Sequence, residues 1–173
     1  MAISLYDVSV TSSLQVLGAV TGILDRGMAF CVDNNIDPNE MVAARLVDDM
    51  QPLHFQIVSV FHHSLGAINS VKAGIATPPP PVGPLDYAGL QKHVADALAG
   101  LKALTPDEIN ALEGKDVTFE MGSFKLPFVA EGYLMSFALP NLHFHATTTY
   151  DILRARGVPL GKRDYLGQMR MKG

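Results

Sequence analysis

Apolar residues recur at spacings of three and four along four long stretches of the chain, which is the period of an amphipathic helix. The pattern predicts long helices over residues 4–32, 51–72, 86–103 and 131–156. Signals that combine a capping residue, a proline and a glutamate predict two short helices, over residues 41–49 and 105–112. Glycines in the first long helix would allow a neighbouring helix to approach it closely.

Two stretches break the helical pattern. Residues 78–81 are four consecutive prolines, which predict an extended crossover, with a proline-rich docking ligand as the alternative. Apolar and polar residues alternate on both sides of Gly122 and Ser123, which predicts a β-hairpin over residues 117–128 that packs against the helices. Together the elements predict a mainly α-helical fold: a four-helix bundle with long crossovers and one small β-hairpin before the last helix, in a single domain of residues 1–173.

The composition narrows the classes of protein. Hydrophobic residues make up 48% of the 173 residues and charged residues 17%, whereas soluble domains usually carry roughly 25% charged residues. This apolar excess predicts a thick core and a homodimer. No uninterrupted apolar stretch reaches the roughly 18 residues of a membrane helix, so we expect no membrane span. The net charge of −4 and the lack of a basic stripe argue against nucleic-acid binding.

The chain holds one cysteine and six histidines. Cys31 cannot form an internal disulfide and is expected to be a small buried hydrophobic side chain. The amino terminus lacks the features of a secretory leader, so a cytoplasmic location is predicted. Any metal site must therefore use imidazole and oxygen ligands. His93 lies among polar residues and is expected to be solvated.

Helix phase predicts which of these side chains face inward. On the last long helix, Asn141 and His145 fall one turn apart on the apolar face, and His143 falls on the opposite face. An inward imidazole and an oxygen-bearing side chain four residues earlier can offer two metal ligands in a bundle core. A core histidine that is satisfied by hydrogen bonds is the alternative.

The second long helix gives a weaker indication. Neither His62 nor His63 lies at the centre of its apolar stripe, so one of them reaches a seam between helices or both lie on the surface. His63 shares its flank with Gln56 and with Ala67, which is small enough to admit a neighbouring helix. Asp49, just before this helix, is expected to cap it.

One segment near the carboxyl end is the most specific in the chain: Pro-Asn-Leu-His-Phe-His-Ala-Thr-Thr-Thr-Tyr-Asp-Ile-Leu-Arg over residues 140–154. With residues 49–56, the His62-His63 pair, the hairpin and residues 157–162, it resembles the DinB/YfiT-like superfamily of four-helix bundles. Within that superfamily the chain resembles an uncharacterised bacterial family, the domain of unknown function numbered nineteen-ninety-three. The resemblance spans nearly the whole chain.

The resemblance implies a metal site. Members of the superfamily hold a divalent metal, commonly zinc or nickel, with one histidine from the second helix and an HxxxH pair from the last, and some are transferases that act with low-molecular-weight thiols. The first position maps to His63, with His62 as the other register, and the pair maps to Asn141 and His145. Asparagine thus replaces one histidine, and a neutral amide oxygen is a weaker ligand for these metals.

The replacement of a histidine of the superfamily pattern by Asn141 leaves two candidate functions. In the first, His63 and His145 hold a divalent ion, Asn141 ligates it or orients a water, and the protein is a metal-dependent transferase or hydrolase. Such a site either binds metal poorly or recruits His54, His62 or Asp49 as a further ligand. In the second, the metal site is lost and the protein is a non-catalytic dimeric bundle that binds a small ligand or only fixes helix register. The missing imidazole favours the second.

Overall fold

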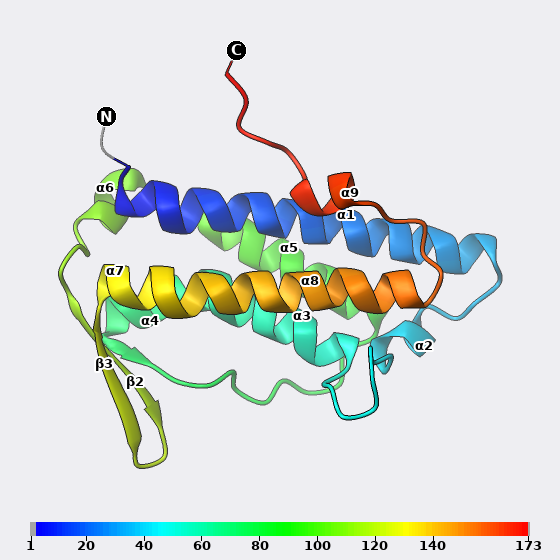
Figure 1. Cartoon of the computed structure of the whole chain (residues 1–173), viewed down its shortest axis with the longest axis horizontal. Coiled ribbons are helices and arrows are strands. Elements are labelled where there is room, and N and C mark those ends of the chain that lie inside the picture. Colours follow the sequence, from blue (N-terminus) through cyan, green and yellow to red (C-terminus); the bar gives the residue numbers. More distant parts are fainter. Residues whose placement is uncertain (1–2, 173) are drawn as a thin grey trace.

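The computed structural model describes residues 3–172 as a bundle of long helices that lie side by side (Figure 1). The first two residues and the last residue of the predicted domain lie outside that range. Both α1 and α3 pack against both α5 and α8, so these four helices close a ring around the core. The predicted four-helix bundle is therefore confirmed. The bounds of these helices are α1 (Ser12–Asp33), α3 (Leu53–Phe61), α5 (Tyr87–Lys102) and α8 (Leu139–Ala155).

Three of the long helices contain a π-helical turn, which the apolar period did not predict. One precedes α1, one joins α3 to α4 (Ala67–Ala73), and one joins α7 (Ala130–Tyr133) to α8. The last of them ends two residues before Pro140, which has no N–H to bond the carbonyl four residues earlier. In this turn the Leu139 amide bonds the carbonyl of Leu134, five residues earlier. The turns span Asp7–Thr11, His62–Gly66 and Leu134–Ala138.

The short helices agree with the sequence in part. At α6 (Pro106–Asn110), the Thr105 hydroxyl accepts a hydrogen bond from the Glu108 amide at 3.3 Å, as the capping signal predicts. The short helix predicted over residues 41–49 was wrong beyond residue 42, because α2 spans only Asn39–Val42. The Leu53 amide bonds back to the Ala44 carbonyl at 2.9 Å. A continuing helix would carry the chain about 1.5 Å further away with each residue, so this bond requires a loop.

A small sheet lies beside α4 and α7 at one end of the bundle (Figure 1). Strands β2 (Asp116–Met121) and β3 (Phe124–Val129) form the predicted hairpin, with Gly122 at a φ of +61° in the turn. A two-residue strand, β1 (Ile75–Ala76), pairs with β2 in parallel and was not predicted. The proline-rich crossover that follows forms no helix or strand as far as α5, as expected.

The first long helix is both long and apolar. Asp7–Asp33 is long and apolar enough to cross a membrane by those two measures alone, although half of its apolar 18-residue stretch is buried inside the bundle. Cys31 is fully buried, as predicted. At Gly27 the hydroxyl of Tyr87 comes so close that an added Cβ would lie 2.2 Å from it, which confirms the predicted close approach at this glycine.

The carboxyl-terminal segment crosses α1 and ties it to α8. Helix α9 (Lys162–Leu166) places Asp164 3.1 Å from Arg26 of α1. Gln15, also in α1, donates a hydrogen bond to the Leu166 carbonyl at 2.9 Å. Two apolar side chains ahead of α9, Val158 and Leu160, are buried in the core.

Candidate functional site

Polar side chains are buried along the seam where α3 and its following π turn meet α8. Gln56 and Ser59 come from α3, His63 from the π turn, and His145 from α8. His63 is 6% exposed and His145 9% exposed. Positions 56, 59 and 63 repeat at spacings of three and four, so they lie on one helical face. A polar cluster therefore lies at this seam, inside an otherwise apolar bundle.

Gln56 orients the ring of His145. Its side-chain Nε2 donates to the Gln51 carbonyl at 2.9 Å, which leaves Oε1 to accept a hydrogen bond from Nδ1 of His145 at 2.8 Å. A neutral imidazole that donates from Nδ1 keeps a lone pair on Nε2. His145 thus presents Nε2 as an acceptor or ligand, with its tautomer set by Gln56.

His63 lies next to His145, and its Nδ1 lacks a hydrogen-bond partner. The two ring centroids are 5.6 Å apart and the ring planes differ by 5°. The buried Nδ1 of His63 makes no hydrogen bond, and neither does the buried hydroxyl of Ser59, one turn earlier. Buried polar atoms without partners are rare in folded proteins and often mark a site for a water or an ion.

Aromatic rings surround the pair. Phe55 and Phe144 pack edge-on against His145, and Phe137 packs edge-on against His63. Burial lowers the pKa of His63 to about 3, helped by the neighbouring imidazoles of His62 and His145. Burial likewise lowers the pKa of His145 to about 4, with a smaller effect of His62. Both rings are therefore neutral at physiological pH, which is the state that binds metals.

The side chain of Asn141 is hydrogen-bonded to the backbone of its own helix. Its side-chain nitrogen donates to the Phe137 carbonyl at 2.8 Å, and the residue is half-buried. This bond leaves the amide oxygen as the remaining acceptor. Asn141 thus lies one turn before His145, as the helix phase predicts, and offers an oxygen where the superfamily pattern has an imidazole.

Two other histidines hold the proline-rich crossover against the bundle. His62 is half-buried and bonds the Thr77 carbonyl through Nε2 at 2.8 Å, and its ring packs edge-on against His63 at 4.9 Å. His54 bonds the Gly83 carbonyl through Nε2 at 3.1 Å. The reading of His62 and His63 as two surface residues is therefore wrong. Because α3 packs against both α5 and α8, the flanks of its apolar stripe are buried as well.

The remaining candidates lie apart from the pair. His143 is exposed beside the Tyr165 hydroxyl, as predicted. His93 was expected to be solvated, but it is half-buried and stacks on Phe61 with a centroid distance of 4.4 Å. Asp49 is exposed in a loop, and α3 begins without a side-chain cap, so the predicted capping role is wrong.

The ligand set is smaller than the superfamily pattern implies. Among residues 3–172, no three His, Cys, Asp or Glu side chains come together in a group that could hold a metal. The sequence indicated His145 by its helix phase. It indicated His63 together with Gln56, because both lie on the same flank of the second long helix. It gave no separate reason to select Ser59, whose signal is a lone hydroxyl between the apolar residues 57–58 and 60–61.

One comparison with known proteins identifies the family of the chain, and another supports its fold. The sequence profile of DUF1993, a domain of unknown function, matches residues 5–166. The chain is also similar to the crystal structure of a DinB family member protein from Shewanella denitrificans, with 26% sequence identity and a TM-score of 0.80. That match covers 98% of this chain and 95% of the other. No curated protein matches the chain.

Proposed function

This chain belongs to the DUF1993 family, and from that premise we propose that it binds one divalent transition-metal ion, zinc or nickel, between His63 and His145. One observation carries the proposal. The buried Nδ1 of His63 has no hydrogen-bond partner, and it belongs to a ring 5.6 Å from that of His145. Two imidazoles that share an ion approach each other closely, because each metal–nitrogen bond is about 2.0–2.1 Å long.

The chemistry of the donors fits such an ion. Neutral imidazoles suit zinc and nickel, and Gln56 holds His145 in the manner of an outer partner that fixes the tautomer and orientation of a metal-binding histidine. Asn141 adds an amide oxygen one turn from His145. A bound ion would supply Lewis acidity at this seam.

The two-imidazole set supports a weak site more than a tight one. Catalytic zinc sites use three protein ligands, commonly histidine, carboxylate or cysteine, and this seam offers two imidazoles and one neutral oxygen. We therefore expect an affinity below that of a three-histidine site. The reaction class, a transferase or hydrolase with a low-molecular-weight thiol as substrate, stays a prediction from the resemblance. The homodimer and the cytoplasmic location stay predictions from the composition and the amino terminus.

A non-catalytic bundle is the second candidate, and the Gln56–His145 hydrogen bond favours it. Such a bond satisfies Gln56 of α3 and His145 of α8 together and fixes the register of the two helices without any ligand. Between an ion and an organic ligand, the tight packing of aromatic rings around the pair favours the ion, since an ion needs no cavity.

A metal-loading experiment separates the two candidates. Protein without a histidine tag is incubated with zinc or nickel, dialysed and analysed for bound metal; we expect about one equivalent in the wild type and less than about a tenth in His145→Gln or His63→Gln. His143→Gln, two residues from His145 and exposed, is the matched control and should bind as the wild type does. Circular dichroism confirms that each variant is folded.

Two results would contradict the metal site. The first is wild-type protein that keeps less than about a tenth of an equivalent after either metal, which leaves the non-catalytic bundle. The second is a loss of metal in His143→Gln equal to that in His145→Gln. A Gln56→Leu variant adds a finer check, because the loss of an outer partner typically weakens metal binding by about 10–100-fold.

A further inference from the structure

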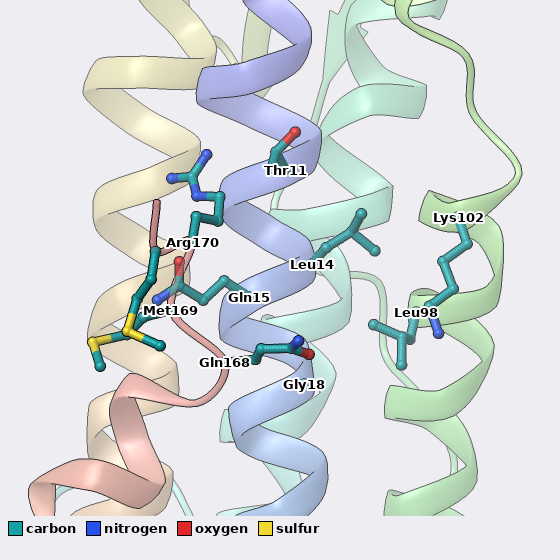
Figure 2. Close-up of a pocket in the computed structure, with 10 residues that line it drawn as sticks. Thr11, Leu14, Gln15, Gly18, Leu98, Lys102, Gln168, Met169 and Arg170 are labelled. Atoms are coloured by element: carbon teal, nitrogen blue, oxygen red, sulfur yellow. The ribbon is translucent and has the colours of Figure 1, made fainter. Parts of the chain in front are cut away.

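A groove lies on the other side of the bundle, between α1, α5 and the carboxyl-terminal tail. Its volume is about 530 Å³, within the usual range for small-molecule sites. Figure 2 shows Leu14 of α1 reaching towards Leu98 of α5, with the tail residue Gln168 crossing α1 beside Gly18. The groove shares no lining residue with the histidine pair, so it is independent of the proposed metal site.

The floor of the groove is open because of Gly18. A Cβ added there would meet no atom within 4 Å, and the residue has an ordinary helical backbone. A larger side chain at this position would therefore project into free space in the groove. Gly22, one turn further along α1, is equally open but does not line the groove. The two glycines form a matched pair for testing what the groove holds.

The charge of the groove is opposite to that of the chain. The protein has a net charge of −4, yet the lining contains two cations, Lys102 and Arg170, and no acidic residue. Figure 2 places them on opposite sides of α1. Hydrogen bonds from Ser4 are the main reason that the pKa of Asp7 is lowered, and the charge of Arg170 adds a smaller effect. Lys102 runs back along α5 towards Leu98 and joins none of the ion pairs among residues 3–172. It is the cation that faces the apolar part of the groove.

We propose that this groove binds a free aliphatic carboxylate of medium chain length. The carboxylate lies against the ammonium group of Lys102, and the hydrocarbon chain lies along Leu14 and Leu98 and over Gly18. An apolar floor with the Lys102 ammonium group at its edge selects a ligand that is apolar along its body and anionic at one end. A cationic amphiphile of the same length has the wrong charge for the site.

Isothermal titration calorimetry with dodecanoate, kept below its micelle concentration, tests the proposal. We expect saturable binding with one site in the wild type and about tenfold or weaker binding in Gly18→Leu, because leucine fills the space that the chain occupies. Gly22→Leu should bind as the wild type does. Both variants replace glycine within a helix, so both should unfold at an equal or higher temperature than the wild type.

The role of Lys102 is tested with a second pair of variants. Lys102→Met should weaken dodecanoate binding by about tenfold, since it removes a charge-assisted contact. Lys92→Met, on the same helix but paired with Asp96, should leave binding unchanged. Dodecyltrimethylammonium, the cationic probe, should give no saturable binding to the wild type.

Several outcomes would overturn the proposal. One is the absence of saturable dodecanoate binding to the wild-type protein. Others are equal affinities for Gly18→Leu and the wild type, or equal losses in Lys102→Met and Lys92→Met. Binding to vesicles of anionic phospholipid without binding to monomeric dodecanoate would show that the surface takes a membrane and not a free carboxylate.

Discussion

Tyr87 joins α5 to α1 through a contact that only glycine permits. Its hydroxyl donates to the Leu24 carbonyl at 2.9 Å and lies over Gly27, and the side chain is 1% exposed. The ring cannot swing away, because it is enclosed by the core and held by this bond. The close approach of the two helices thus depends on one missing Cβ.

Gly27→Ala should therefore destabilise the protein. The added Cβ would lie 2.2 Å from the Tyr87 hydroxyl, and overpacking of this kind typically costs about 1–3 kcal/mol. Gly22→Ala, in the same helix with no atom near the added Cβ, should be neutral or stabilise by up to about 1 kcal/mol. Urea denaturation measures both, and an unchanged midpoint for Gly27→Ala would show that Tyr87 can move.

His93 makes the stability of the fold depend on pH. Burial against Phe61 is the main reason that its pKa lies below 6.5; His54 and Lys92 also lower it, and Asp96 raises it. The unfolded chain then binds the proton more readily than the folded chain. The contribution of His93 is complete above pH 6.5 and is lost as the pH falls from there towards the folded-state pKa.

The comparison of wild type with His93→Phe isolates this effect. Phenylalanine keeps the stacking on Phe61 and does not titrate. Between about pH 7.5 and pH 5 we expect the wild type to lose more free energy of unfolding than the variant does. Guanidinium denaturation at the two pH values measures the difference. Equal losses would show that His93 has the same pKa in the folded and unfolded states.

At the scale of elements, helix period and capping signals predicted the four long helices, α6 and the hairpin, because each depends on neighbours in sequence. What the sequence could not show depends on contacts between elements. The loop after α2 follows from the Leu53–Ala44 hydrogen bond, and the burial of His63 follows from α8 packing beside α3. His145 was predictable because it faces the centre of the bundle, where a single helix period suffices.

The start of α5 shows how capping joins elements. The Asp86 side chain accepts from the Gly89 amide at 2.7 Å, and Asn39 of α2 accepts from the Tyr87 amide at 3.0 Å. Asp86→Ala should lower the free energy of unfolding by about 1 kcal/mol, within the range of about 0.5–2 kcal/mol for lost caps. Asp86→Asn should keep most of the wild-type stability, because asparagine can also cap a helix. Thermal denaturation distinguishes the variants. Equal losses in both would show that charge, and not the cap, is what stabilises this end.

For the whole molecule, the carboxyl-terminal segment has two parts: residues 157–166 stabilise the bundle, and residues 167–172 lie over the groove. Val158 and Leu160 are buried, and α9 is bonded to α1. Residues 167–172 are exposed, and the DUF1993 match ends at residue 166. The bundle thus depends on the chain as far as α9, and the residues beyond it lie over the groove between α1 and α5.

Two truncations test this division. A chain that ends at Leu166 removes no buried side chain and should change the free energy of unfolding by less than about 0.5 kcal/mol. A chain that ends at Arg156 loses Val158, Leu160 and the Arg26–Asp164 pair, and burial of the two apolar side chains alone is worth about 3–6 kcal/mol. Chemical denaturation of both should give a near-wild-type midpoint for the first and a much lower one for the second. If the shorter tail alone lowered the midpoint as much, residues 167–172 would be part of the fold and not a cover over it.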